Sequence, residues 1–248
     1  TAMETSGAVL KAKDITSLLK EPWAIGLAEV MNFPGVILRD PDVLKKIEAA
    51  GDKRIDGHAP MLTGKGLSAY LVAGIRSDHE CTTSKEAKEK LKSGMWIMVR
   101  EGPAARNLED LLPVVTPTNA RRFFFVTDDR HPKELLEEGH IDSIVRKAIG
   151  LGLDPVLAIQ MATLNAAEYF RLDGLGAIAP GFRADIVAFD HPSRFRISKV
   201  FKDGVLVAKD GAILSRSAKG RKNPFQAGNR ILQAKRSVRT APLKKQKS

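Results

Sequence analysis

The fold of this chain is indicated by two short stretches, Arg54-Ile55-Asp56-Gly57-His58-Ala59-Pro60 and Ser77-Asp78-His79-Glu80. Each is an apolar-to-polar segment that contains a histidine flanked by carboxylates, and a helix-like run lies between them. His58 and His79 are 21 residues apart. This is about the length of one strand–helix unit, since a (β/α)₈ barrel of ~250 residues allots roughly 31 residues to each unit. Side chains at the carboxyl ends of neighbouring barrel strands converge on one mouth, so the two histidines could share a metal ion. The alternative is a pair of surface or helix-capping histidines that never meet.

The composition is that of a globular protein. The 248 residues suffice for one large α/β domain or two ordinary ones, and a hydrophobic content of 43% allows a sizeable core. The single cysteine, Cys81, excludes a disulfide framework and favours a reducing, cytoplasmic location. The sequence has no apolar run of about 18 residues and no signal peptide, so no membrane segment is expected. Because position 1 is threonine, we expect a fragment or a processed product.

The net charge of +11 comes from the last part of the sequence. Residues 214–248 contain eleven of the 40 Lys and Arg residues and no acid, so the remaining 29 basic residues balance the 29 acidic ones in 1–213. A neutral body argues against the basic groove of a nucleic-acid enzyme. We expect residues 214–248 to form a flexible, solvated tail that contacts nucleic acid weakly, if at all.

Five times in residues 1–172, an apolar run is followed by a polar loop and a helical pattern. Continuous apolar runs suit strands that are buried on both faces, and alternating strands and helices call for a parallel sheet. A loop is expected at 31–35, and Thr83 and Glu86 predict a capping box. The expected strands are residues 23–28, 55–58, 75–79, 95–99 and 122–126. The expected helices are residues 13–19, 41–50, 67–74, 85–92, 108–115, 141–151 and 155–170.

Each expected strand ends at a charged or metal-ligand side chain: Glu29, His58, His79, Glu101 and Asp128. A barrel gathers such residues at one mouth, where the active sites of barrels lie. An open doubly wound sheet would spread them along a line, and no Gly-rich phosphate loop supports that alternative. We therefore predict the α/β class and a partial (β/α)₈, TIM-like barrel.

The pattern changes after Leu172 to short apolar runs separated by glycine and proline. Residues 200–207 predict a hairpin with its turn at Asp203-Gly204. The predicted organisation is five βα units of a barrel in 1–172, a small β module in 173–213 and the basic tail in 214–248.

Several motifs carry a resemblance to known families. The stretches Thr163-Leu164-Asn165-Ala166-Ala167, Leu175-Gly176-Ala177-Ile178 and Pro180-Gly181-Phe182-Arg183-Ala184-Asp185-Ile186-Val187 are similar to the end of the metal-dependent amidohydrolase superfamily. A finer set resembles adenine deaminases of the bacterial type, and it covers about residues 1 to 213. That set is Gly26-Leu27-Ala28-Glu29-Val30-Met31-Asn32, Asp56-Gly57-His58-Ala59-Pro60, Ser77-Asp78-His79-Glu80, Arg100-Glu101-Gly102 with Ala105-Arg106-Asn107-Leu108, and Thr127-Asp128-Asp129-Arg130-His131-Pro132.

The resemblance implies a two-metal enzyme that converts adenine to hypoxanthine and ammonia. It implies that Glu29 bridges the metals and that His58 and His79 ligate one of them. Asp128 would hold the other metal and act as the general base, with Glu80 as a partner at the purine edge. The expected metal is Mn²⁺, with Fe²⁺ or Zn²⁺ as alternatives. Arg100 and Glu101 are candidate substrate contacts.

Asp129 is not expected to be a ligand, because neighbouring strand residues point to opposite faces. Surface roles are expected for His131 and His140, and a buried thiol for Cys81. The partner is expected to be a small purine base, and the full-length protein a homo-oligomer.

The sequence departs from the family pattern at one place. Family members open with a His-x-His pair, and no histidine precedes His58 here. A site short of two imidazoles should bind metal loosely, so we expect little activity from this chain alone. Two alternatives stay open. One is a related amidohydrolase acting on another cyclic amidine or amide, and the other is a non-catalytic truncated product whose tail binds nucleic acid.

Overall fold

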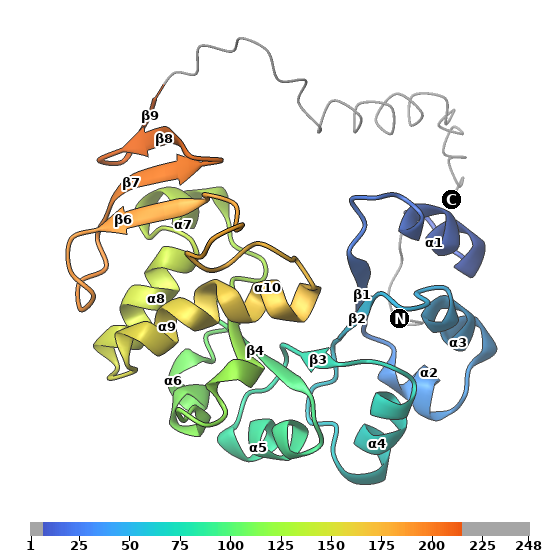
Figure 1. Cartoon of the computed structure of the whole chain (residues 1–248). Helices are drawn as coiled ribbons and strands as arrows, with labels where there is room; N and C mark the ends of the chain where they lie inside the picture. Colours follow the sequence, from blue (N-terminus) through green and yellow to red (C-terminus); the bar gives the residue numbers. More distant parts are fainter. Residues whose placement is uncertain (1–6, 215–248) are drawn as a thin grey trace, which may run out of the picture.

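Five strands lie side by side in the computed structural model, which describes residues 7–214 (Figure 1). β1 pairs in parallel with β2, and β3, β4 and β5 form a parallel group in that order. The N–H of Arg76, just before β3, donates to the carbonyl of Ile55 in β2 at 3.1 Å, so the two groups are neighbours. The strands are β1 Gly26–Val30, β2 Arg54–Gly57, β3 Ser77–Asp78, β4 Trp96–Arg100 and β5 Phe123–Val126.

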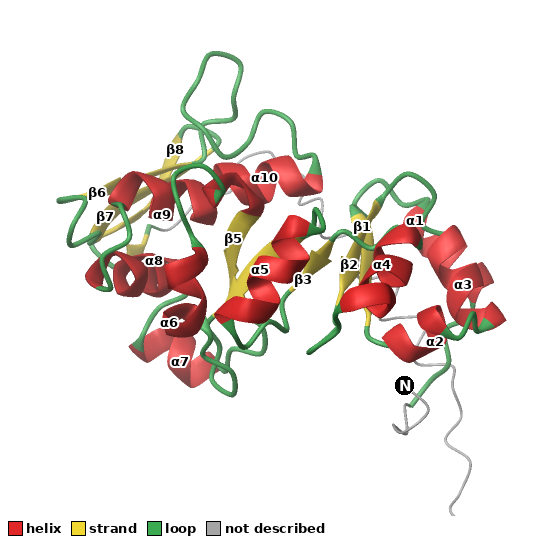
Figure 2. Ribbon diagram, turned by 90° about the horizontal axis from the view of Figure 1, so that it is seen from below, coloured by secondary structure: helices red, strands yellow, loops and turns green. Residues whose placement is uncertain are grey.

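Helices pack on both faces of these strands, most of them on the outer face (Figure 2). They are α1 Ala12–Leu19, α2 Phe33–Ile37, α3 Pro41–Glu48, α4 Gly64–Val72, α5 Ser84–Lys92, α6 Leu108–Leu111, α7 Pro132–Glu137, α8 Ile141–Gly150, α9 Pro155–Ala162 and α10 Leu164–Phe170. Two short 3₁₀ helices, Leu112–Val114 and Ala120–Arg122, lie between α6 and β5. The expected sequence of strand and helix is present, as the predicted partial barrel requires. None of the helices in residues 7–214 is long and apolar enough to cross a membrane.

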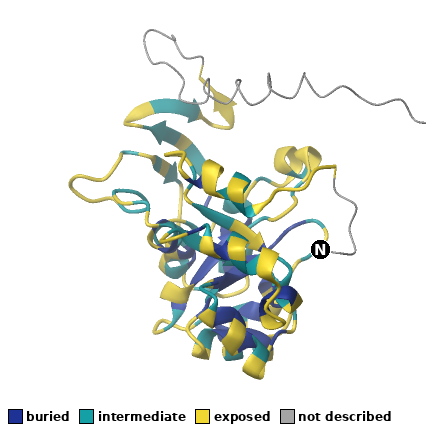
Figure 3. Ribbon diagram, turned by 90° about the vertical axis from the view of Figure 1, so that its right-hand side faces the viewer, coloured by how far each residue is buried: buried dark blue, intermediate teal, exposed yellow. Residues whose placement is uncertain are grey.

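The core lies between the strands and the outer helices, where Figure 3 shows the buried ribbon. Alternate residues of a strand face opposite ways. Ile97 and Val99 of β4 therefore pack with residues of α8 and α9, whereas Met98 packs on the other face against Phe124 and Tyr169 of α10. This alternation directs Arg100, the last residue of β4, to the same face as Met98.

A four-stranded antiparallel sheet follows the barrel strands. The predicted hairpin is present between β7 and β8, and Asp203 and Gly204 have φ values of 50° and 76°, as a type I′ turn requires. Its strands are β6 Ile186–Phe189, β7 Ile197–Lys202, β8 Val205–Lys209 and β9 Ala212–Ile213. The boundaries of the three predicted domains stay predictions, and the basic tail lies outside the described residues apart from Leu214.

Three expectations about local structure are wrong. The expected loop at 31–35 contains the start of α2, whose first turn is capped by the side chain of Asn32, which accepts from the N–H of Gly35 at 3.0 Å. The expected helix 155–170 is broken at Thr163, where the backbone adopts φ −135° and ψ −84°. The expected capping box is half formed, because the Thr83 side chain accepts from the N–H of Glu86 but the Glu86 carboxylate binds other groups.

Candidate functional site

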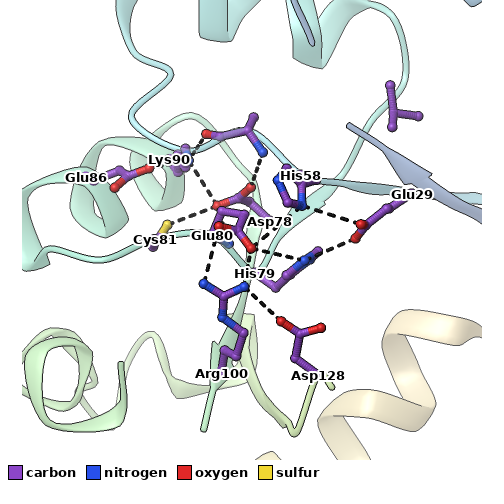
Figure 4. Close-up of polar contacts among 12 residues, drawn as sticks. Glu29, His58, Asp78, His79, Glu80, Cys81, Glu86, Lys90, Arg100 and Asp128 are labelled. Atoms are coloured by element: carbon purple, nitrogen blue, oxygen red, sulfur yellow. Dashed lines mark hydrogen bonds and ion pairs between the residues drawn. The ribbon is translucent and has the colours of Figure 1, made fainter. Parts of the chain in front are cut away.

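A hollow of about 270 Å³ lies at the carboxyl ends of the strands. The side chains come from Glu29 in β1, His58 after β2, His79 and Glu80 after β3, Arg100 at the end of β4 and Asp128 after β5. Figure 4 shows these six side chains gathered around one space. Parallel strands joined by helical crossovers bring their carboxyl ends to one rim, and that geometry explains the convergence of residues so far apart in sequence.

Three of these residues form a group that could hold a metal ion. One ligand atom each from Glu29, His58 and His79 lies within 4.8 Å of the others. The Nε2 atom of His79 is 3.1 Å from Oε2 of Glu29, and the Nδ1 atom of His58 is 3.4 Å from Oε1 of the same carboxylate. The imidazole rings of the two histidines are 5.2 Å apart and nearly perpendicular. One carboxylate therefore spans both imidazoles.

Glu80 and Asp128 form the other side of the hollow. With His79 they make a second group of ligand atoms within 4.8 Å of one another. The Arg100 guanidinium bonds both oxygens of Glu80, and its Nη1 atom donates to Asp128 at 2.8 Å. Arg100 thus holds two acidic side chains together at the rim. The backbone of Asp128 has a φ of 54°, a left-handed conformation that is uncommon for residues other than glycine.

The charges at the site depend on one another. A hydrogen bond from His79 lowers the pKa of Glu29, although burial opposes this shift. Burial would lower the pKa of His79, but the hydrogen bond and the charge of Glu29 raise it. Burial likewise opposes the charge on Arg100, yet the contacts with Asp128 and Glu80 raise its pKa. The carboxylates of the site therefore face two positively polarised partners, His79 and Arg100.

The donor set fits a divalent metal ion. The Nδ1 atom of His58 is buried and has no hydrogen-bond partner, because its contact with Glu29 lacks hydrogen-bond geometry. A buried imidazole nitrogen that has no hydrogen-bond partner and lies beside a carboxylate is available to ligate a metal ion. Imidazoles and carboxylates suit Zn²⁺, Fe²⁺ and Mn²⁺.

A buried network behind the site was missed by the sequence analysis. The Asp78 carboxylate, which faces away from the hollow, accepts hydrogen bonds from the N–H of Ala59 at 2.8 Å and of Glu80 at 3.1 Å. The Lys90 ammonium donates to Asp78 at 3.0 Å and to Glu86 at 2.6 Å. A signal was present in the sequence, because Glu86 and Lys90 are four residues apart on the face of α5 that also carries Ala87.

A second network lies deeper between the strands. The Tyr169 hydroxyl donates to Asp56 at 2.5 Å, and its oxygen lies 2.8 Å from the Ser77 hydroxyl. Burial raises the pKa of Asp56 against these hydrogen bonds. On the opposite side, the Tyr70 hydroxyl accepts from the N–H of His58 at 3.0 Å and donates to the carbonyl of Val30. These tyrosines tie β1, β2, β3 and α10 together below the ligand residues.

Glu101 does not line the hollow. Its carboxylate pairs with Lys147 of α8 at 2.7 Å and accepts from the N–H of Leu108 at 3.2 Å. The expected substrate contact of Glu101 is therefore not supported, because both carboxylate oxygens are engaged in structural contacts.

The other residues singled out in the sequence lie in different surroundings. Asp129 lines the hollow beside Asp128, although no ligand group includes it among the described residues. His131 and His140 are exposed near the start of α7 and α8, and Cys81 is buried and free.

Comparisons with known proteins agree with this geometry. Residues 9–207 match the model of the Amidohydrolase family. An adenine deaminase of Desulfatibacillum aliphaticivorans is 56% identical over 213 residues, which are 85% of this chain and 37% of the relative. An adenine deaminase of Dehalococcoides mccartyi is 54% identical over 214 residues, 86% of this chain and 38% of the relative. The chain thus spans less than two-fifths of the length of these relatives.

Solved structures with the same fold are more distant in sequence. An enamidase of the amidohydrolase superfamily superposes with a TM-score of 0.61 at 16% identity, over 84% of this chain and 61% of the enamidase. A beta-aspartyl dipeptidase of Fervidobacterium islandicum superposes with a TM-score of 0.57 at 18% identity, over 84% of this chain and 62% of the dipeptidase. These likenesses concern the fold, and they confirm the predicted barrel class.

Proposed function

The chain belongs to the amidohydrolase family, and from that premise we propose that it forms part of an adenine deaminase. The reaction is the hydrolysis of adenine by water to hypoxanthine and ammonia. One observation carries the proposal: Glu29, His58, His79, Glu80 and Asp128 meet around one hollow at the carboxyl ends of the strands. The names of the similar deaminases support the choice of substrate, a purine base.

In the proposed site, Glu29, His58 and His79 hold a divalent metal ion, with Mn²⁺ the expected ion and Fe²⁺ or Zn²⁺ the alternatives. Glu29 and Asp128 would be the residues that hold a second ion. Bound metal ions would supply Lewis acidity, which lowers the pKa of a bound water far below its ordinary value, towards ~7. The absence of a hydrogen-bond partner for the buried His58 Nδ1 atom supports its role as a ligand.

Asp128 is the proposed general base. It takes a proton from the attacking water as the oxygen forms a bond to C6 of adenine, and the proton is then delivered to the exocyclic amine. The C6–N bond breaks and the amine leaves as ammonia. The Arg100 guanidinium donates to Asp128 at 2.8 Å, so a fixed cation orients the proposed base.

Glu80 is the proposed partner of the purine edge. Negative charge develops on the ring when water adds to C6, so ring nitrogen N1 must be protonated at the same stage. A carboxyl group at the rim can supply that proton, and it regains one from the C6 hydroxyl as ammonia leaves and the C6=O bond forms. Glu80 lies beside His79, 3.4 Å from its Nε2 atom. Arg100 bonds Glu80 and Asp128 together, which favours a role in orienting the two carboxylates over a direct substrate contact.

The test is an assay of the purified protein with Mn²⁺ against adenine, adenosine, cytosine and dihydroorotate. Slow formation of hypoxanthine, from adenine alone, is expected, and Asp128→Asn should lower kcat by 10²-fold or more, as about 10²–10⁴-fold is typical for a lost general base. Asp129→Asn, the change of the neighbouring carboxylate, should cost much less. Product from another substrate would assign a related amidohydrolase. Salt-sensitive RNA binding without any product would favour the non-catalytic alternative.

A further inference from the structure

Asp78 joins the backbones of the two segments that carry the proposed metal ligands. Its Oδ1 atom accepts from the N–H of Ala59, next to His58, and its Oδ2 atom accepts from the N–H of Glu80, next to His79. Oδ2 also accepts from the Cys81 thiol at 3.3 Å. A single carboxylate thus fixes the backbone on both sides of the site (Figure 4).

Lys90 completes this arrangement from helix α5. Its ammonium donates to Asp78 at 3.0 Å, to Glu86 at 2.6 Å and to the carbonyl of Ala59 at 2.6 Å. The side chains of Lys90 and Asp78 are completely buried. Glu86 in turn accepts from the N–H groups of Met61 and Thr82, at 2.7 and 3.3 Å. The three donors of Lys90 are therefore all used: on the backbone after β2, on the last residue of β3 and on α5 itself.

Burying three charges is costly unless each is paired and hydrogen-bonded, and a hydrophobic group of similar size would often be as stable. These charges bind backbone groups beside His58 and His79 and leave the hollow itself untouched. Partners of this kind tune metal affinity by holding ligands in place. We propose that Asp78 and Lys90 are positioning residues that set the separation of His58 and His79, an inference that rests on the proposed function.

Binding of Mn²⁺, followed by calorimetry and by its electron paramagnetic resonance spectrum, tests the inference. Asp78→Asn and Lys90→Met should weaken Mn²⁺ binding about 10–100-fold and alter the spectrum of the bound ion. Lys88→Met, an exposed change on the same helix, should alter neither. Folded variants that bind Mn²⁺ with unchanged affinity and spectrum would overturn the inference, even if their melting temperatures fall.

Hydrogen exchange covers the case in which both variants fail to fold. In the unmodified protein, the amides of Ala59 and Glu80 should exchange as slowly as those of the buried strand β4. Fast exchange at either amide would overturn the positioning role. If the unmodified protein binds no Mn²⁺, the proposed metal site is wrong. The exchange rates of the Ala59 and Glu80 amides then test by themselves whether Asp78 and Lys90 hold the two backbone segments.

A second, independent feature lies at the opposite ends of the strands. A hollow of about 640 Å³ is lined by Arg54, Arg76, Arg121 and Arg122 with Trp96. Arg54 begins β2, Arg76 precedes β3, and Arg122 precedes β5. The chain therefore brings four arginines together at the amino-terminal ends of strands whose carboxyl ends carry the acidic site.

These arginines have little compensating negative charge. Among residues 7–214, the one carboxylate paired with them is Glu168, 3.2 Å from Arg121. Arg54 and Arg122 lie over the rings of Tyr169 and Trp96, at 5.2 and 5.4 Å from the ring centres. Burial lowers the pKa of Arg54, and the nearby Arg171 and Arg76 lower it further. Stacking thus orients two guanidinium groups in a place where positive charges repel one another.

Guanidinium groups bind phosphate oxygens in pairs, and a multiply charged anion would relieve the repulsion. We infer that this arginine-lined hollow binds a small molecule that carries two or more phosphate groups. Inorganic pyrophosphate is the probe. In a Trp23→Phe background, Trp96 is the one remaining tryptophan, because the chain has 2. Its emission should change in a saturable way on titration.

The double change Arg76→Gln/Arg121→Gln, which leaves both stacked arginines in place, should weaken pyrophosphate binding at least tenfold. Arg196→Gln, an exposed arginine of the β module, should leave it unchanged. No saturable change, or equal affinity in the double variant, would overturn the inference. Binding of an oligoribonucleotide without binding of pyrophosphate would also overturn it and would mark a nucleic-acid surface.

Discussion

Lys90 shows how one residue can decide the stability of the region behind the site. Burial lowers the pKa of Lys90, but the neighbouring Asp78 raises it above its ordinary value, so the ammonium stays charged. Lys90→Met would leave two buried carboxylates without their cation. We expect a loss of about 3–5 kcal/mol in the free energy of unfolding. Urea unfolding would measure it, with Lys88→Met as the neutral control, and a loss equal to that of the control would contradict the expectation.

Glu29 is the residue on which the proposed metal site most depends, since its carboxylate spans both histidines. Glu29→Gln keeps the size of the side chain and removes its charge. We expect Mn²⁺ binding to weaken more than tenfold, because an amide is a much poorer ligand than a carboxylate. Met31→Leu, a change in the lining of the same hollow, should bind Mn²⁺ like the unmodified protein. Equal affinities of Glu29→Gln and the unmodified protein would exclude Glu29 as a ligand.

At this scale, the sequence predicts residues that follow strands better than residues that pair across the chain. Glu29, His58, His79 and Asp128 each follow or end an apolar run, and strand geometry brings them together. Glu101 does the same, yet its partner Lys147 lies 46 residues away on a helix whose position the sequence does not reveal. The contacts of Asp78 with Ala59 and Lys90 are equally non-local.

At the scale of elements, the spacing of β2 and β3 depends on Gly57. A Cβ atom there would lie 2.3 Å from the carbonyl oxygen of Ser77, a backbone atom that cannot move alone. Gly57→Ala should therefore push the strands apart, at a cost of about 1–3 kcal/mol. Because His58 is the next residue, Mn²⁺ binding should weaken as well. Thermal unfolding measures the first effect. Gly150→Ala, with nothing within 4 Å of the new methyl group, should lower neither property.

The β module should show an acid-sensitive element at Asp185. Its slight burial would raise the pKa, but hydrogen bonds from Lys202, the N–H of Asp203 and Arg183 lower it well below 3.8. A carboxyl whose pKa is lowered by folding adds stability above its ordinary pKa, and this is lost as the pH falls through the folded-state pKa. Asp185→Asn should therefore lower the melting temperature at neutral pH, and the difference should shrink below pH 3.8.

Asp210→Asn is the control for the change at Asp185, because it removes a charge from the same module at an exposed turn. It should lower the melting temperature at neutral pH much less than Asp185→Asn does. A deficit of Asp185→Asn that stays constant from neutral to acidic pH would contradict the proposed role of the charge.

The sequence predicts helices and strands where the local hydrophobic pattern is strong. It does not predict where a helix is interrupted. Residues 155–170 are helical throughout by composition, but Thr163 leaves the helical region and α10 turns so that Asn165 reaches β5. Its amide donates to the carbonyls of Ala120 and Phe123, both at 2.8 Å. That tertiary hydrogen bonding, which the sequence does not display, outweighs the preference for one continuous helix. Helix α7 was missed because His131-Pro132 follows a run of loop-forming residues.

For the whole molecule, the alternation of strands and helices predicted the partial barrel, because parallel strands with helical crossovers allow few arrangements. What the pattern does not specify is how the edge of the sheet is covered. Among residues 7–214, β1 has a paired neighbour on one side, β2. Unpaired strand edges and exposed apolar side chains favour pairing with another chain.

The edge at β1 predicts concentration-dependent association of the isolated chain. Trp23 and Ile25, just before β1, are 58% and 46% exposed, so the apolar surface beside the open edge is accessible. Sedimentation velocity over a range of concentrations should show oligomers. Trp23→Lys/Ile25→Lys should shift them to monomer, because charges beside an edge strand oppose edge-to-edge pairing. Leu38→Lys removes an apolar side chain that is 80% exposed elsewhere and should leave association unchanged. A monomer at every concentration, or equal effects of the two changes, would show that this edge is not where copies meet.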